Sequence, residues 1–81
     1  MARQPYPGGI RLFYFMRLRI NGEIMEIRDA ATVGALLEHL GVEPARVAVE
    51  VNLAVVKKAD YGSFRLNDGD EVEIVNFVGG G

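Results

Sequence analysis

The chain of 81 residues contains no cysteine and no tryptophan, and it has a single histidine. The absence of cysteine excludes disulfide bonds and thiolate metal ligands, and it makes a cytoplasmic location the default expectation. The sequence also has no Ser/His/Asp set, no cluster of metal-ligand residues and no phosphate-binding glycine loop. We therefore expect no bound cofactor, no metal and no catalytic machinery of the chain's own.

Charge and hydropathy exclude two further classes of partner. Nine Lys and Arg residues against eleven Asp and Glu residues give a formal net charge of −2, without a basic cluster. Because phosphate binding needs a concentrated basic face, we expect no nucleic-acid partner. No stretch is long and apolar enough to predict a membrane span. With 49% hydrophobic and 25% charged residues, the composition is typical of one small globular domain.

The first part of the chain differs in composition from the rest. Residues 1–9 are rich in Pro and Gly, residues 10–15 are apolar and aromatic, and a second methionine follows at Met16. We interpret residues 1–15 as an N-terminal extension, either non-native or partly ordered as a lengthening of the first strand, and residues 16–81 as the functional domain. The alternative of a signal peptide is disfavoured, because Arg11 interrupts a short apolar stretch.

The first half of the domain predicts a hairpin followed by a helix. Apolar residues alternate over 16–20 and again over 24–28, and Asn21-Gly22 between them is typical of a two-residue turn. A helix is then predicted to begin after Thr32 as N-cap and to end at Gly41. Its apolar stripe has the spacing i, i+3, i+4 and i+7 and consists of Val33, Leu36, Leu37 and Leu40.

The second half predicts three more strands. Residues 47–51 alternate as a strand, residues 53–56 form a short edge strand, and residues 71–77 form the last strand after an irregular stretch at 57–64 and a tight turn at 67–70. This order of elements predicts the α+β class and a ubiquitin-like β-grasp, with a mixed sheet packed on one main helix. In that topology the last strand is central and lies beside the first.

The final residues contain the candidate functional group. Val78 is followed by Gly79, Gly80 and Gly81, which contribute nothing to a core and predict a flexible tail with a free carboxylate. Fully extended, three glycines reach on the order of 10 Å, enough to enter a narrow channel in another protein. The plainer alternative is a linker or remnant without a role.

Strand parity predicts a docking patch beside this tail. Val72 and Ile74 should face the helix, which leaves Val75 and Phe77 on the opposite face with Val78 following them, and Ile24 on the same face by the same argument. The alternative is that Phe77 packs on the body of the domain or on the extension.

Charged residues near these positions have simpler interpretations. The pair Glu71 and Glu73 is expected on the solvent side of its strand, with guidance of a basic partner as a lesser role. The single histidine, His39, is expected to be solvated or to cap the helix end.

Several segments together resemble the ThiS family of sulfur carrier proteins, which are related to ubiquitin and to MoaD. The resemblance covers residues 16–81, and it is carried by residues 20–23, 32–37, 47–52, 68–75 and 78–81. No single segment is specific. The resemblance rests on the order of these segments, the length of the domain and the glycines at its end.

The resemblance implies a function for the tail. The carboxylate of Gly81, or of Gly80 if Gly81 is trimmed, would be adenylated with ATP by a ThiF-like activating enzyme, and Gly79 and Gly80 would give access. A sulfur donor such as a cysteine desulfurase would convert it to a thiocarboxylate, and thiazole synthase would take the sulfur for thiamine. The chain would then be a protein co-substrate and not an enzyme.

Three alternatives stay open from the sequence. A MoaD-like subunit of molybdopterin synthase would share the tail chemistry but serve another pathway. A plain ubiquitin-like interaction module would use the sheet and leave the glycines without a role. Protein tagging is a further alternative.

Overall fold

The elements follow one another in the predicted order. The computed structural model describes residues 15–77, so expectations for residues 1–14 and 78–81, the flexible tail among them, lie outside it. The strands and helix are β1 (Phe15–Ile20), β2 (Glu23–Arg28), α1 (Val33–Leu40), β3 (Val47–Val51), β4 (Ala54–Val56) and β5 (Glu71–Asn76). Two 3-10 turns, η1 (Pro44–Arg46) and η2 (Lys58–Asp60), join them.

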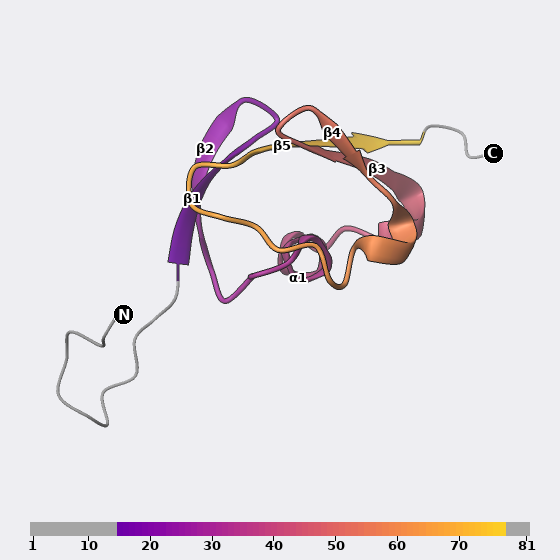
Figure 1. The fold of residues 1–81 in the computed structure, drawn as a ribbon, viewed down its shortest axis with the longest axis horizontal. Helices are drawn as coiled ribbons and strands as arrows, with labels where there is room; N and C mark the ends of the chain where they lie inside the picture. Colours follow the sequence, from indigo (N-terminus) through magenta and orange to yellow (C-terminus); the bar gives the residue numbers. More distant parts are fainter. Residues whose placement is uncertain (1–14, 78–81) are drawn as a thin grey trace, which may run out of the picture.

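The five strands form one mixed sheet in the order β2-β1-β5-β3-β4. Strand β5 is central: it runs parallel to β1, with Ile20 opposite Val72, and antiparallel to β3, with Val49 opposite Ile74. The sheet arches over α1, which lies against one of its faces (Figure 1). This arrangement confirms the ubiquitin-like β-grasp.

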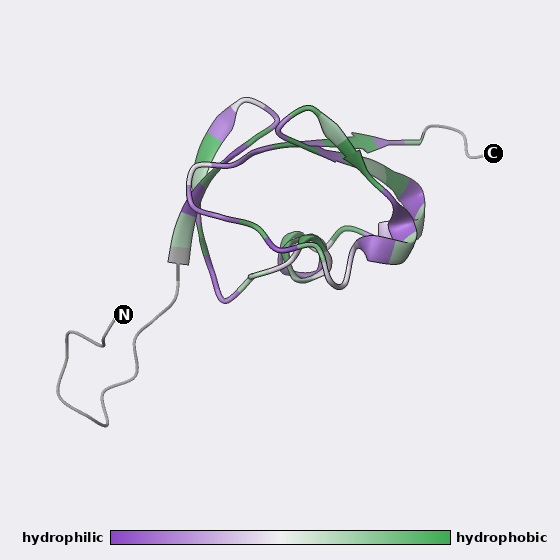
Figure 2. Cartoon of the chain, viewed as in Figure 1, coloured by the Kyte–Doolittle hydropathy of each residue, from purple (hydrophilic) through white to green (hydrophobic). Residues whose placement is uncertain are grey.

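The core lies between the sheet and the helix. Alternate strand residues and one stripe of the helix supply it, and Figure 2 shows hydrophobic residues recurring along these elements while the loop before β5 is hydrophilic. The buried side chains include Met16, Leu18, Ile27, Val33, Leu36, Leu37, Val47, Val49, Val51, Leu66 and Val72. The opposite face of the sheet has no helix over it among residues 15–77.

Both ends of α1 are capped as predicted. The Thr32 hydroxyl accepts a hydrogen bond from the Ala35 N–H at 3.1 Å. At the other end Gly41 adopts φ 73°, a left-handed conformation that costs glycine nothing, and its N–H donates to the Glu38 carbonyl at 3.0 Å. The caps hold the helix to two turns beneath the sheet.

Two asparagine side chains extend the hydrogen bonding of β5 beyond its neighbouring strands. Asn21 Oδ1 accepts from the Ile74 N–H at 2.8 Å, and Asn21 Nδ2 donates to the Ile74 carbonyl at 3.2 Å. Near the start of β5, Asn52 Oδ1 accepts from the Glu71 N–H at 2.9 Å. Both asparagines have positive φ, 50° and 51°, which this residue type tolerates better than most. Each turn therefore clamps the central strand.

Two boundaries differ from the sequence prediction. Leu53 belongs to the turn between β3 and β4, with φ 72°, because two residues are needed to reverse the chain before β4 can pair with β3. Strand β5 ends at Asn76, one residue before the predicted end at Phe77. Over residues 15–77 no helix has the length and hydropathy to cross a membrane.

The clamp on β5 leads to a stability prediction. Asn21→Ala should lower the free energy of unfolding by about 1–3 kcal/mol, because it removes two hydrogen bonds and places alanine at positive φ. Asn21→Gly removes the same hydrogen bonds but keeps the backbone unstrained, so its loss should be smaller. Urea unfolding of both variants measures this. Equal losses would show that the backbone conformation contributes nothing.

Candidate functional site

The candidate site is the end of β5, where the chain leaves the sheet at Phe77. The Phe77 N–H donates to the Arg46 carbonyl at 2.9 Å, which continues the pairing with β3 one residue past the strand. The chain is thus held in an extended path up to its last described residue. The predicted tail residues Val78, Gly79, Gly80 and Gly81 lie outside the described residues.

The predicted docking residues are exposed on the uncovered sheet face. The exposed fractions are 62% for Ile24, 55% for Val75 and 52% for Phe77, whereas Val72 is fully buried and Ile74 is half-buried against the core. The parity prediction is therefore confirmed for β5. Val75 and Phe77 lie two residues apart next to the tail. Ile24 lies on β2, with β1 between it and β5, so the structure does not join it to the other two.

Phe77 makes one specific contact with the body of the domain. The Lys58 ammonium lies 4.7 Å from the centre of the Phe77 ring, and its Nζ also donates to the Val47 carbonyl at 2.9 Å. A cation over an aromatic face is attracted by the ring quadrupole. Since half of Phe77 stays exposed, this contact orients the ring without burying it.

Two further apolar side chains on the β3–β4 hairpin escaped the sequence prediction. Leu53 is 84% exposed at the tip of the hairpin and Val55 is 71% exposed on β4. Val55 lies opposite Glu50, and Val75 lies opposite Ala48 on the other side of β3. Strand β3 therefore lies between Val55 and Val75, and only the register of the sheet shows that both side chains are on the same face.

Tyr61 is hydrogen-bonded to the first residue of β3. Its buried hydroxyl donates to the Val47 carbonyl at 3.1 Å, the same oxygen that Lys58 reaches. Burial raises the pKa of the Tyr61 phenol, so the group stays a protonated donor at neutral pH. Tyr61 therefore has a structural role.

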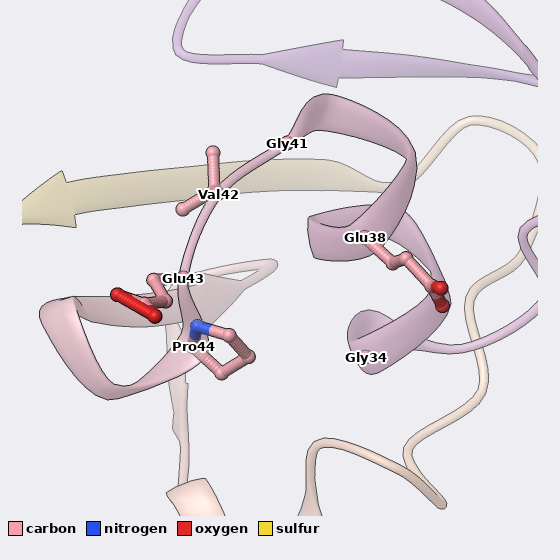
Figure 3. Close-up of a pocket in the computed structure, with 6 residues that line it drawn as sticks. All are labelled: Gly34, Glu38, Gly41, Val42, Glu43 and Pro44. Carbon is pink, nitrogen blue, oxygen red and sulfur yellow. The ribbon is translucent and has the colours of Figure 1, made fainter.

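A groove beside α1 does not form a ligand site. It is lined by Gly34, Glu38, Gly41, Val42, Glu43 and Pro44. Figure 3 shows the carboxylates of Glu38 and Glu43 pointing away from each other, so they do not converge on a common ligand. Within residues 15–77 no group of three His, Cys, Asp or Glu side chains is placed to hold a metal ion. His39, Glu71 and Glu73 are exposed, as expected.

Comparison with known proteins places this fold and tail in one group. Residues 18–81 match the ThiS family. The chain is 52% identical over 66 residues, 82% of its length, to thiazole synthase from Paramagnetospirillum magneticum, of which the match covers 20%. It is 38% identical over 65 residues, 79% of its length, to the sulfur carrier protein ThiS from Bacillus subtilis, of which it covers 98%.

A solved structure agrees in fold. The crystal structure of the thiamine biosynthesis protein ThiS from Geobacter metallireducens superposes with a TM-score of 0.70 at 35% identity, covering 82% of this chain and all of that one. By contrast, the chain spans only 20% of the length of the thiazole synthases from Paramagnetospirillum magneticum and Magnetococcus marinus. The similarity is therefore to a whole small domain and to a segment of a longer protein.

Exposure of Phe77 predicts that it contributes little to stability. Phe77→Ala should lower the free energy of unfolding by at most about 1 kcal/mol, the size of its cation–π contact with Lys58. Val72→Ala on the buried face of the same strand should cost roughly 2 kcal/mol, because it leaves a cavity. Chemical denaturation of both variants makes the comparison. A loss for Phe77→Ala as large as for Val72→Ala would mean that Phe77 is a core residue.

Proposed function

Because the chain belongs to the ThiS family, we propose that it is a sulfur carrier of thiamine biosynthesis, and that its terminal glycine carboxylate is the group that carries sulfur. One observation supports this most: the family match runs through residue 81 and so includes the glycine run that follows β5. The Bacillus subtilis relative and one from Escherichia coli are named sulfur carriers, and the chain covers 98% and 100% of their lengths.

The chemistry requires prior activation of the carboxylate, because a carboxylate is an anion with a poor leaving group. We propose that a ThiF-like enzyme joins the Gly81 carboxylate to the AMP portion of ATP and releases pyrophosphate. A persulfide supplied by a cysteine desulfurase or an equivalent donor then displaces AMP and forms an acyl disulfide. A second thiol of the loading enzymes cleaves its S–S bond, which leaves a thiocarboxylate on the chain and a disulfide on the enzymes. The chain acts here as a recycled co-substrate, and ATP binds to the activating enzyme. If Gly81 is removed, Gly80 takes the same role.

We propose thiazole synthase as the acceptor of the sulfur. Support comes from two proteins named thiazole synthase that contain a segment similar to this domain, at 52% and 42% identity. A carrier domain and its acceptor in one polypeptide have a high effective concentration, which is useful only if the two act together. We place this exchange in the cytoplasm.

We propose that the uncovered face of the sheet docks a partner. Val75 and Phe77 form an exposed apolar surface shortly before the glycines, where a partner that binds the domain would also position the carboxylate, and we propose that Val78, the next residue along the chain, contributes to the same contact. Ile24 lies on the same face, on the edge strand β2, and would make a separate contact with the partner. A MoaD-like role or a plain interaction module would use the same surface, but the named relatives favour the thiamine carrier.

The first functional prediction concerns the mass of the chain. Incubation with ATP, a ThiF-like enzyme and sulfide should add about 16 Da, because one oxygen is exchanged for sulfur on a group carrier. Intact-mass spectrometry detects the product, and omission of ATP is the control. An unchanged mass with every cognate activating enzyme would contradict the carrier role.

The second functional prediction separates the tail from the fold. Deletion of Gly80 and Gly81 should abolish sulfur transfer but leave the melting temperature unchanged, since the core is made of residues between Met16 and Val72. Circular dichroism and the mass assay are read on the same sample. A marked loss of thermal stability would show that the tail is part of the structure.

A further inference from the structure

Phe77, the last described residue, is attached to the body of the domain at two points. Its N–H donates to the Arg46 carbonyl at 2.9 Å, and the Lys58 ammonium lies 4.7 Å from the centre of its ring. Arg46 ends η1 and Lys58 begins η2, so both contacts come from segments that are distant from Phe77 in sequence. The backbone and the ring of the residue that precedes the tail are therefore each held by a contact outside β5.

The Lys58 side chain is itself held in place. Its Nζ donates to the Val47 carbonyl at 2.9 Å, and the ion pairs found in residues 15–77 do not include it. The Tyr61 hydroxyl donates to the same carbonyl at 3.1 Å, so that oxygen keeps a hydrogen-bond partner without Lys58. The bond from Lys58 is thus not needed to satisfy a buried acceptor, and its consequence is to hold the ammonium beside the ring of Phe77.

The cation–π contact lies at the end of a strand, where pairing is weakest. The pairing of β5 with β3 ends at Asn76, opposite Val47, and the bond from Phe77 to Arg46 is the last one that the structure describes beyond it. Hydrogen bonds at the end of a strand open more readily than those in its centre. Because Phe77 is 52% exposed, little apolar burial opposes this opening. The attraction between the Lys58 cation and the ring opposes it instead.

We propose that Lys58 is a positioning residue for the loading of sulfur, because it fixes the point from which the glycine tail starts. This role rests on the proposed function. When Phe77 is held, residues 78–81 are the arm that the activating enzyme has to order. When the end of β5 opens, Asn76 and Phe77 join that arm. Each further residue that has to be ordered adds a loss of conformational entropy, so the carboxylate at the end of a longer arm reaches the reactive geometry less often.

The test measures sulfur loading of the full chain by the ThiF-like enzyme with ATP and sulfide. Lys58→Met keeps the length of the side chain but removes its charge, so kcat should fall about two- to fivefold, the factor of an exposed cation–π contact. KM should stay unchanged, because Val75 and Phe77 remain exposed to a partner. Lys58→Arg retains a cation that stacks on aromatic rings and should load as wild type. The matched control is Lys57→Met at the exposed neighbouring position, which should also load as wild type.

A second background shows whether Lys58 acts through the ring. Phe77→Leu keeps an apolar side chain at this position but removes the aromatic face. In that background Lys58→Met should have no further effect on kcat, because the two residues are coupled through one contact. An equal loss in both backgrounds, or an unchanged kcat of Lys58→Met in the wild-type background, would overturn the proposal.

NMR of the free chain reads the contact without any partner enzyme. The methylene protons next to the Lys58 ammonium should be shifted upfield by the ring current of Phe77, and this shift should disappear in Phe77→Leu. The amide proton of Phe77 should exchange with solvent about two- to fivefold faster in Lys58→Met than in wild type. Faster exchange along the whole of β5 would indicate a general structural role of Lys58 and would overturn the proposal.

Failure of the positioning role is distinguishable from failure of the carrier function. If wild type is loaded with sulfur and Lys58→Met is loaded with the same kcat, the carrier function stands and the positioning role fails. If wild type gains no sulfur while the Phe77 amide still exchanges faster in Lys58→Met, the contact stands, but the carrier function fails and the positioning role fails with it.

Discussion

Strand β5 is hydrogen-bonded along both of its edges, and the path of the chain up to Phe77 depends on this. Strand β1 lies on one side and β3 on the other, and Asn21 and Asn52 add side-chain hydrogen bonds at Ile74 and Glu71. A strand held in this way cannot shift by one residue without moving its buried side chains to the wrong face. The direction in which the chain leaves the domain at Phe77 is therefore set by the whole sheet.

The two faces of that sheet have different tasks. One face buries Val72 against α1 and supplies the stability of a small domain. The other leaves Val55 and Val75 exposed and carries Glu50 opposite Glu73 in the register of β3 with β5.

Local patterns made most of the fold predictable. The stripe from Val33 to Leu40, the cap at Gly41 and the alternation along each strand depend on neighbours in sequence, and each is found in the structure. The contacts that escaped prediction join distant residues. Asn21 and Ile74 are separated by 53 positions, and the facing of Glu50 and Glu73 appears only once the register is known. The unbroken apolar run of residues 53–56 predicts a strand that includes Leu53, but the two-residue turn takes Leu53 at φ 72°, a conformation unusual for leucine. For the candidate site, parity placed Val75 and Phe77, whereas the role of the glycines came from resemblance.

The central claim is that the terminal carboxylate carries sulfur in the cell. Its most direct test is top-down mass spectrometry of the protein isolated from thiamine-starved cells, in which demand for the thiazole sulfur is high. We expect a fraction of the protein to be heavier by about 16 Da, with the added mass confined to the fragment that contains the C-terminal glycines. A protein that stays unmodified under starvation, or that carries its added mass on another fragment, would contradict the account.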